Sequence, residues 1–262
     1  MLTKRHGDIL RLLNEHGTVT VTDLADTLGV SMETVRRDLK PLADLGKVVR
    51  MHGAASLAGQ SGEAPFERRM RENAPAKRAI ARHVAGTIAD GDSIMLDTGT
   101  TTSFLARELL GHRRLTVVTN SSDIARTLAT VNNNRVYMAG GELRSDSGAA
   151  FGASAIEFIT RFSVRHAIIS TGAVDARLGV MDYDLEEAEF ARTVLERGER
   201  SVVITDHTKF GRQGLVTVSG FANIDELVTD ETPPGELAQA LASTETVLTV
   251  AGQDDALQRA LP

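Results

Sequence analysis

The chain has 262 residues, a formal net charge of −6 and no cysteine, which excludes disulfides, thiolate catalysis and cysteine-based zinc sites. Hydrophobic residues make up 42% of the sequence and charged residues 24%, values typical of a globular protein with a buried core. No segment approaches the roughly 20 apolar residues of a membrane span and the charged first residues show no signal peptide, so we expect a cytoplasmic protein that binds no membrane.

Three helices and a basic strand are expected in the N-terminal part of the chain. The first helix spans about 3–15, a second begins at Thr20 with a capping-box pattern, and a third begins at Ser31 after a glycine turn. Apolar residues of the third helix recur at helical spacing and face inward, while residues 47–52 form a strand. This order predicts a winged helix-turn-helix, which leaves the opposite face of the third helix free for the DNA major groove.

The outward face of the third helix and the following strand are rich in groups that bind DNA. An arginine can contact a guanine edge through two hydrogen bonds, and lysine or serine can hold phosphates. Residues 1–53 carry eight Lys or Arg against seven Asp or Glu, whereas the other 209 residues carry 21 against 28, so this part alone is basic. The predicted DNA-binding residues are Ser31, Glu33, Thr34, Arg36, Arg37, Lys40, Arg50 and His52.

Two alternatives would explain the same pattern without DNA. The third helix would then be a solvated basic helix, or the helices would form a protein-binding module. A salt titration distinguishes these alternatives from DNA binding, because phosphate contacts make the affinity fall steeply with salt.

A stretch containing glycine and proline separates two predicted domains. We predict a DNA-binding domain over residues 1–57, a linker over 58–75 and an α/β sensor domain over 76–262. In the sensor domain short apolar strands alternate with helices, which implies right-handed crossovers and a mainly parallel, helix-covered sheet. The expected strands are 93–97, 115–119, 135–139, 166–170, 201–205, 226–229 and 247–250, and the expected helices are 76–89, 101–110, 121–130, 153–161, 185–198 and 234–243.

Small and polar residues follow five of the expected strands. Because ligands bind outside the carboxyl ends of strands in open α/β sheets, these residues predict one shared effector cleft. The turn from Asp97 to Thr102 favours phosphate, since a glycine turn before a helix aims backbone N–H groups at one point. A capped helix start without a ligand is the alternative. The predicted effector-binding residues are Asp97, Gly99, Thr100, Thr101, Thr102, Asn120, Gly140, Gly141, Arg144, Gly172, Asp175, Asp206 and Lys209.

Charged residues around this predicted cleft have different interpretations. Arg144 and Lys209 are candidate phosphate partners, because each follows the end of a strand. We interpret the acidic run from Leu185 to Glu189 as the solvated face of a helix. The histidines show no paired spacing of metal ligands and the strand turn lacks a nucleotide-binding pattern, so neither a metal nor another cofactor is predicted.

Sequence motifs over nearly the whole chain resemble the DeoR family of bacterial repressors. The N-terminal motif comprises Leu24-Ala25, Leu28-Gly29-Val30-Ser31 and Thr34-Val35-Arg36-Arg37-Asp38-Leu39, followed by Arg50-x-His52-Gly53-Ala54. The C-terminal motifs include Ala139-Gly-Gly-Glu-Leu-Arg-Ser145 and Asp206-His-x-Lys-Phe-Gly-Arg212. The family usually has two glycines after the wing histidine, and here Ala54 replaces the second.

The resemblance implies a fold, an operator contact and a function. It implies a sensor domain similar to ribose-5-phosphate isomerase and contacts of Arg36 and Arg37 with the operator, with Asp38 orienting a neighbouring arginine. It further implies a repressor of a carbohydrate or polyol operon that a phosphorylated metabolite, such as glycerol 3-phosphate, releases from DNA. We also expect a homodimer or homotetramer, because one winged helix buries too little DNA for tight specific binding.

An enzyme is the other function that such a fold suggests. Asp97, Asp175 and Lys209 would then act as the acid–base groups of a sugar-phosphate isomerase. The acidic run and the glycine-rich lysine loop of that enzyme family are missing, however, and fold alone is poor evidence for function. We therefore expect a sensor and not an enzyme.

Overall fold

The computed structural model describes residues 3–51, 53–57 and 63–252, in two compact units, Met1–Pro65 and Phe66–Pro262. We call them the head and the sensor unit. No helix among the described residues is long and apolar enough to cross a membrane. His52, one of the predicted DNA-binding residues, lies outside the described residues.

Polar side chains begin the three helices of the head. Thr3, Thr20 and Ser31 each accept a hydrogen bond from a backbone N–H of the first turn, which satisfies a donor that the helix itself cannot pair. Apolar side chains from all three helices then meet in one core. The helices are α1 (Lys4–His16), α2 (Val21–Leu28) and α3 (Met32–Asp44), and their fully buried residues include Ile9, Leu13, Leu24, Val35, Leu39 and Leu42.

A three-stranded antiparallel sheet completes the head, in the order β1-β3-β2. The sequence predicts one strand here, over 47–52, whereas the structure has three: β1 (Val19–Thr20), β2 (Val48–Met51) and β3 (Ala54–Leu57). Gly53, with a φ of 74°, provides the left-handed turn between β2 and β3. β1 has only two residues, and β3 is an Ala-Ala-Ser-Leu segment without the β-branched and aromatic residues typical of strands, which explains why neither was predicted.

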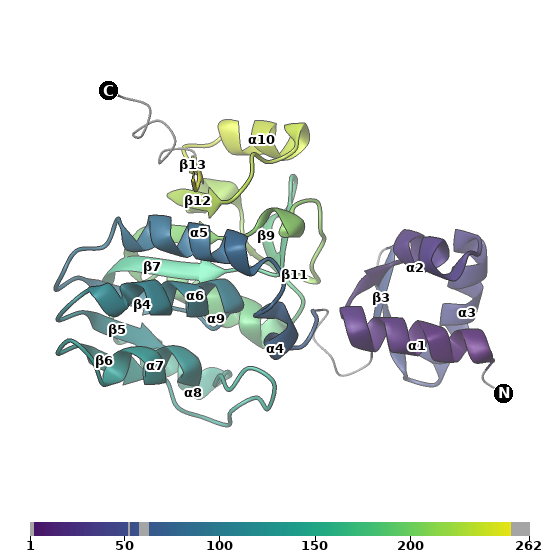
Figure 1. Ribbon diagram of the computed structural model, residues 1–262, viewed down its shortest axis with the longest axis horizontal. Helices are drawn as coiled ribbons and strands as arrows, with labels where there is room; N and C mark the ends of the chain where they lie inside the picture. Colours follow the sequence, from purple (N-terminus) through teal and green to yellow (C-terminus); the bar gives the residue numbers. More distant parts are fainter. Residues whose placement is uncertain (1–2, 52, 58–62, 253–262) are drawn as a thin grey trace. The chain divides into compact units, whose positions relative to one another are not determined.

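The sensor unit is built on a seven-stranded parallel sheet (Figure 1). All seven strands expected from the sequence are present, and the sheet order is β13-β12-β10-β7-β4-β5-β6. The strands are β4 (Ser93–Leu96), β5 (Thr116–Thr119), β6 (Arg135–Met138), β7 (Val164–Ser170), β10 (Gly198–Ile204), β12 (Glu226–Thr229) and β13 (Val247–Val250). The predicted parallel α/β fold is therefore confirmed.

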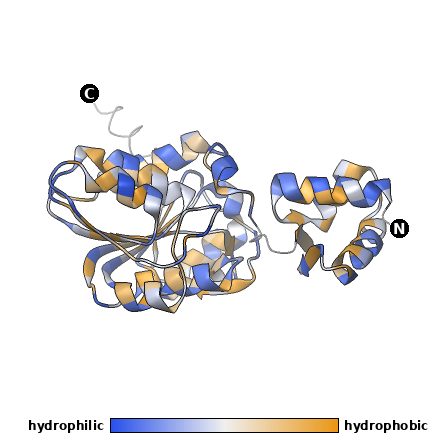
Figure 2. Cartoon of the chain, turned by 90° about the horizontal axis from the view of Figure 1, so that it is seen from below, coloured by the Kyte–Doolittle hydropathy of each residue, from blue (hydrophilic) through white to orange (hydrophobic). Residues whose placement is uncertain are grey.

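Helices cover both faces of this sheet, as Figure 2 shows with the strands seen between two helical layers. Neighbouring residues point to opposite faces: Ile94 packs with α5, α6 and α7, and Met95 packs with α8, α9 and α10. Both faces are buried, which explains the continuous apolar runs of the strands. The helices are α5 (Ala74–Ala85), α6 (Thr100–Glu108), α7 (Ser122–Ala129), α8 (Ala153–Ile159), α9 (Leu185–Leu195) and α10 (Gly235–Ala242).

A second, smaller sheet of the sensor unit was not predicted. It is antiparallel, with the order β11-β9-β8. Its strands are β8 (Ala173–Asp175), β9 (Gly179–Asp182) and β11 (Val216–Ser219). Elsewhere in the sensor unit there are short 3-10 helices, η1 (Leu109–Gly111), η2 (His207–Lys209) and η3 (Phe221–Asn223).

The linker is shorter than the predicted 58–75, because residues 66–75 belong to the sensor unit. α4 (Phe66–Arg69) opens that unit, and Phe66 is buried. Met70 and Ala74 pack against the core beneath α5 and α6. The charged composition of this segment resembles that of a linker, which explains the wrong boundary.

Candidate nucleic-acid interface and effector site

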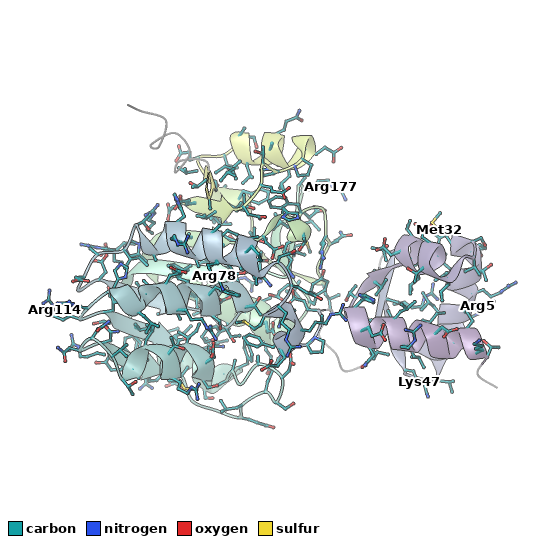
Figure 3. The ribbon with its side chains drawn as sticks, in the orientation of Figure 1. Arg5, Met32, Lys47, Arg78, Arg114 and Arg177 are labelled. Carbon is teal, nitrogen blue, oxygen red and sulfur yellow. The ribbon has the colours of Figure 1, made fainter. Side chains whose placement is uncertain are left out.

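The outward face of α3 is the candidate nucleic-acid interface. Glu33, Arg36, Arg37 and Lys40 are exposed, as predicted, because Val35, Leu39 and Leu42 occupy the buried face of the same helix. Arg36 pairs with Glu33 at 3.6 Å, one turn earlier, whereas Arg37 has no ion pair or hydrogen bond among the described residues. Figure 3 shows Met32 and Lys47 pointing away from the core, so the exposed surface continues beyond the predicted residues.

Ser31, Thr34 and Arg50 complete the predicted set. Ser31 caps α3, and its hydroxyl also lies 2.9 Å from the hydroxyl of Thr34, so these two side chains position the start of the helix. Arg50 is exposed on β2. The interface therefore combines basic groups of α3 and β2 with polar groups at the start of α3. Groups of these types contact the backbone and the bases of DNA.

An ion pair between the half-exposed Arg5 and the buried Asp38 joins α1 to α3. Asp38 is 7% exposed, and its carboxylate accepts hydrogen bonds from Arg5 Nε at 2.5 Å and from Arg5 Nη2 at 3.2 Å. These bonds hold the pKa of Asp38 below its ordinary value of 3.8. The family resemblance implies that Asp38 orients a neighbouring arginine, but its partner Arg5 is 33 residues away in the sequence. The pair therefore fixes α3 on α1.

The candidate effector site lies where the direction of the sheet order reverses. From β4 the chain continues outward to β5 and β6, and then returns to place β7 on the other side of β4. Ligands of open parallel sheets bind outside the carboxyl ends of the strands at such a point. Asp97 follows β4 and is buried there, and its two carboxylate oxygens accept the backbone N–H of Ser170 at 3.1 and 3.2 Å.

Burial changes the chemistry of Asp97. Desolvation, together with the nearby carboxylates of Asp182 and Glu187, raises its pKa well above the ordinary value of 3.8. Asp97 therefore favours the neutral form more than an exposed carboxyl does, and a neutral carboxyl can donate a hydrogen bond to a ligand oxygen.

The turn after Asp97 is packed closely against β7. A Cβ at Gly99 would lie 1.8 Å from Ser170 Oγ, so the turn requires glycine. No side chain caps the start of α6, although Thr100, Thr101 and Thr102 are all buried in its first turn. Thr102 donates to Gly99 O at 3.1 Å and serves the turn itself.

Four buried polar atoms near this turn have no hydrogen-bond partner among the described residues. They are Thr98 Oγ1, Ser103 Oγ, Asn120 Oδ1 and Ser147 Oγ. Asn120 was predicted, and its amide group donates to Ala150 O at 2.9 Å, which leaves the oxygen unpaired. The other three were not predicted, although Thr98 and Ser103 flank the predicted turn in the sequence. Further buried polar atoms without a hydrogen-bond partner, including His6 Nε2 and His112 Nδ1, lie elsewhere among the described residues. The four atoms therefore support a polar ligand only together with the uncapped start of α6.

Arg144 is held by carboxylates. Its guanidinium lies 2.7 Å from Asp184, 2.8 Å from Glu186 and 2.9 Å from Glu187, and 4.4 Å from the ring centre of Phe151. Burial opposes the charged form, but the bonds to Asp184 and Glu186 outweigh it and raise the pKa of Arg144. The acidic run does begin α9 with Leu185 and Glu186 exposed, but the sequence did not predict that Glu186 and Glu187 bind Arg144, and a phosphate would have to displace these carboxylates from Arg144.

The remaining predicted effector residues differ in their surroundings. Gly140 and Gly141 are exposed in the loop after β6. A Cβ at Gly172, after β7, would lie 3.0 Å from the ring of Tyr183. Asp175 lies on the small sheet, where its carboxylate accepts the backbone N–H groups of Arg177 and Leu178 and stabilises the β8–β9 turn.

The loop after β10 contains the last two predicted residues. Asp206 is 1% exposed and caps η2, and its Oδ1 accepts the N–H of Thr208 at 3.1 Å. Lys209 is partly buried at the end of η2. The structure thus brings Asp97, the threonine turn and Asn120 to neighbouring strand ends, and it gives Asp175 and Asp206 clear structural contacts.

A histidine and two carboxylates also meet at this end of the sheet. His207 Nδ1 lies 2.6 Å from Asp230 and 3.4 Å from Glu231, and ligand atoms of the three residues lie within 4.8 Å of one another. Asp230 also accepts the backbone N–H of His207 at 2.7 Å. The bond to Asp230 raises the pKa of His207. These contacts join η2 to the end of β12 through the imidazole of His207 and favour its protonated form.

Two family models match the chain. The DeoR-like helix-turn-helix domain matches residues 5–61, and the DeoR C terminal sensor domain matches residues 72–231. Solved structures with a similar fold include ribose 5-phosphate isomerase A from Neisseria gonorrhoeae, with a TM-score of 0.39, 16% identity and coverage of 52% of this chain and 53% of that chain. The isomerase from Methanocaldococcus jannaschii matches with a TM-score of 0.40 and 16% identity over 53% and 55% of the two chains.

Curated relatives match over almost their whole length. The glycerol-3-phosphate regulon repressor of Escherichia coli (strain K12) is 34% identical over 91% of this chain and 95% of its own. The transcriptional repressor CsqR of the same organism is 34% identical over 95% and 96%, and AccR of Agrobacterium fabrum is 32% identical over 86% and 88%. These relatives are repressors and not enzymes. With its helix-turn-helix head and its α/β sensor unit, the chain belongs to the DeoR family of transcriptional regulators.

Proposed function

We propose that this protein represses a carbohydrate or polyol catabolic operon and that a phosphorylated metabolite such as glycerol 3-phosphate releases it from its operator. The observation that carries the proposal is the turn at the β4–β7 reversal point. The start of α6 there has no side-chain cap, its first-turn threonines are buried, and the hydroxyls of Thr98 and Ser103 on either side of the turn have no partner among the described residues. Backbone N–H groups and hydroxyls in such an arrangement suit a phosphate and the hydroxyls attached to it.

The surroundings of the turn favour a single phosphate on a hydroxylated carbon chain. Asp97 favours the neutral form, but the nearby carboxylates of Asp182 and Glu187 would repel a second anionic group. Hydroxyl groups, by contrast, can donate to such carboxylates. The relatives named for glycerol 3-phosphate support a polyol phosphate, and another sugar phosphate is the alternative at this level of identity.

On the DNA side, α3 would enter the major groove. Arg36 and Arg37 would contact bases or phosphates, with Ser31 and Lys40 on the backbone. The Arg5–Asp38 pair supports this use, because it fixes the helix that carries these groups. Two heads on one operator would supply the contact area that a single head lacks, which favours the homodimer or homotetramer.

The test combines operator selection with a ligand screen. A duplex selected from a random DNA library by the full chain is labelled, and the binding is measured by fluorescence anisotropy at several salt concentrations. The panel of ligands contains glycerol 3-phosphate, ribose 5-phosphate, glucose 6-phosphate, glucosamine 6-phosphate and their unphosphorylated forms. An effector should release the duplex and raise the melting temperature, because it binds the folded protein.

Reciprocal variants serve as matched controls. Arg36→Ala should weaken operator binding and preserve the thermal shift, whereas Thr101→Ala combined with Lys209→Ala should do the reverse. Operator affinity that does not change with salt would contradict the DNA contact. Unchanged effector release in the double variant would show that the effector site is elsewhere.

A further inference from the structure

Residues 66–77, which we call the strap, form the first segment of the sensor unit. They comprise α4, the turn after it and the first turn of α5, and they follow directly on Pro65, the last residue of the head. Figure 1 shows α4 at the end of the sheet toward which β7 points. Whatever moves the strap therefore moves the point at which the chain leaves for the head.

The strap is bonded to the loop after β6. The backbone N–H of Phe66 donates to both carboxylate oxygens of Asp146, at 3.1 Å each. Asp146 lies between Arg144, which binds the first turn of α9, and Ser147, whose buried hydroxyl has no partner among the described residues. One end of the strap thus depends on a loop of the candidate effector site.

The other end of the strap is bonded to the loop after β10. Asn73 Nδ2 donates to Asp206 Oδ1 at 3.1 Å and to Thr208 Oγ1 at 3.3 Å. These two residues begin η2, which also contains Lys209. Both loops contacted by the strap were predicted from the sequence to contribute to effector binding, and they are far apart in the chain.

Asn73 makes these contacts in an unusual conformation. Its φ is 51°, in the left-handed region that favours glycine, and it precedes α5 without capping that helix. Asparagine at this position normally satisfies the N–H groups of its own helix. Here the side chain is used across the fold instead. Asparagine adopts this region more readily than other residues with a side chain, so the backbone conformation leaves the amide available for bonds to the loop after β10.

Contacts within the strap also join α4 to the first turn of α5. Lys77 is 3% exposed, and its ammonium donates to Arg69 O at 2.5 Å, which ties the end of α4 to α5. The guanidinium of Arg69 in turn lies 5.6 Å from the ring centre of Phe66. Phe66 and Asn73 are therefore held in one short unit, so a change at one end reaches the other without passing through the sheet.

We propose that the strap transmits the state of the effector site to the DNA-binding head, with Asn73 and Asp146 as the positioning residues that connect it to the two effector loops. The inference rests on the proposed function for its ligand. A ligand that draws either loop inward changes the hydrogen bonds that hold Phe66 and Asn73. It thereby changes the conformation that the chain adopts where it enters the linker. Such coupling requires that the ligand prefer one arrangement of these contacts.

Hydrogen exchange in the full chain tests the connection without any ligand. In Asn73→Gly, which keeps the left-handed backbone but removes the side chain, exchange should accelerate in residues 206–210 and also at Phe66 and residues 142–149. In Asp146→Ala, at an exposed residue, the distant 206–210 loop should accelerate as well. Each lost bond corresponds to a change of up to about tenfold in local opening.

Two control variants remove comparable bonds elsewhere. Asn132, with a φ of 54°, donates to Leu110 O, and Asp90 accepts the N–H of Arg113, both before the amino ends of strands. Asn132→Gly and Asp90→Ala should leave the exchange of both effector loops unchanged. Acceleration confined to the mutated contact in Asn73→Gly and Asp146→Ala, or acceleration of both loops in the controls, would overturn the proposal.

Operator release gives the second measurement. The compound that releases the wild-type protein should still raise the melting temperature of Asn73→Gly. The factor by which it lowers the operator affinity of this variant should be at least about fivefold smaller than in the wild type. Undiminished release would overturn the proposal. If no compound in the panel releases the wild-type protein, the proposed effector class is wrong, and the exchange measurements still decide whether the strap couples the two loops.

Discussion

Individual residues of α3 have distinct roles that their surroundings define. Arg37 is exposed and has no ion pair among the described residues. Arg36 forms an ion pair with Glu33, and Asp38 is buried against α1. The free energy of operator binding should therefore depend most on Arg37, since no protein contact has to be broken for it to reach DNA.

Arg37→Ala should weaken operator binding by about 1–3 kcal/mol without lowering the melting temperature. A loss for all sequences alike, with a salt slope smaller by about 1, would identify a phosphate contact, whereas relaxed specificity at one position would identify a base contact. Arg11→Ala on α1, an exposed arginine paired with Glu15, is the control. Equal binding by the Arg37 variant and the wild type would rule out this contact.

Gly99 should be intolerant of any side chain. In Gly99→Ala the new methyl group would overlap Ser170 Oγ at 1.8 Å, so we expect a loss of about 1–3 kcal/mol in unfolding free energy and a loss of the effector's thermal shift. Ser170→Ala in the same chain should restore part of the stability, because it removes the overlapping atom. No recovery in the double variant would mean that the turn is constrained by other contacts.

His207 gives the stability of the sensor unit a dependence on pH. Its pKa is raised above 6.5 by Asp230, so the pair contributes stability that is fully present below 6.5 and is lost as the pH rises through the raised value. The difference in melting temperature between the wild type and His207→Gln should therefore be largest below 6.5 and shrink in alkaline buffer. A difference that grows with pH would contradict this sign.

At the scale of elements, α1 and α3 share an apolar core and are also joined by the Arg5–Asp38 ion pair. The pKa of Asp38 is lowered by Arg5, so this contribution is present above 3.8 and is lost as the pH falls through the lowered value. Asp38→Asn should lower the melting temperature and the operator affinity together at neutral pH. Exchanging the two residues, as Arg5→Asp with Asp38→Arg, should restore part of both; restored stability without restored binding would limit the pair to folding.

Elements that are buried on both faces or carry polar caps were predictable, and those outside the regular alternation of strands and helices were not. The strands of the large sheet are buried on both faces and read as apolar runs, and the head helices have polar caps and helical spacing. The strands β8 and β9 follow β7, and β11 follows β10, without an α-helix in between, so the alternation of strands and helices that identified the large sheet did not apply to them. α4 has four residues, too few for a helical period. Tertiary pairs such as Arg5–Asp38 depend on packing that no local pattern encodes.

The candidate effector site was predictable to a similar extent. The turn around Gly99 was identified because glycine and threonine directly follow an apolar strand. The partners of Arg144 were missed, since they are about 40 residues away and lie on a helix whose acidic face looked solvated. Ser147 and Asn73 were missed for the same reason: their environment comes from loops that only the folded sheet brings together.

For the whole molecule, the two units have separate cores, and this predicts separable activities. A fragment of residues 1–65 should fold and bind the selected duplex with salt-dependent but weaker affinity, and residues 66–262 should keep the effector's thermal shift. Analytical ultracentrifugation of both fragments would show whether either of them forms the proposed dimer or tetramer. An unfolded head fragment would mean that its core needs the rest of the chain.

The order of strands in the large sheet also has a consequence for synthesis. β4, the first of these strands to leave the ribosome, is followed by β5 and β6 on one side and by β7, β10, β12 and β13 on the other. Every new strand thus joins an existing edge, and none has to be inserted between two others. The large sheet can therefore form outward from β4 as the chain is translated. The edge of β4 that binds β7 stays unpaired until β7 has been synthesised.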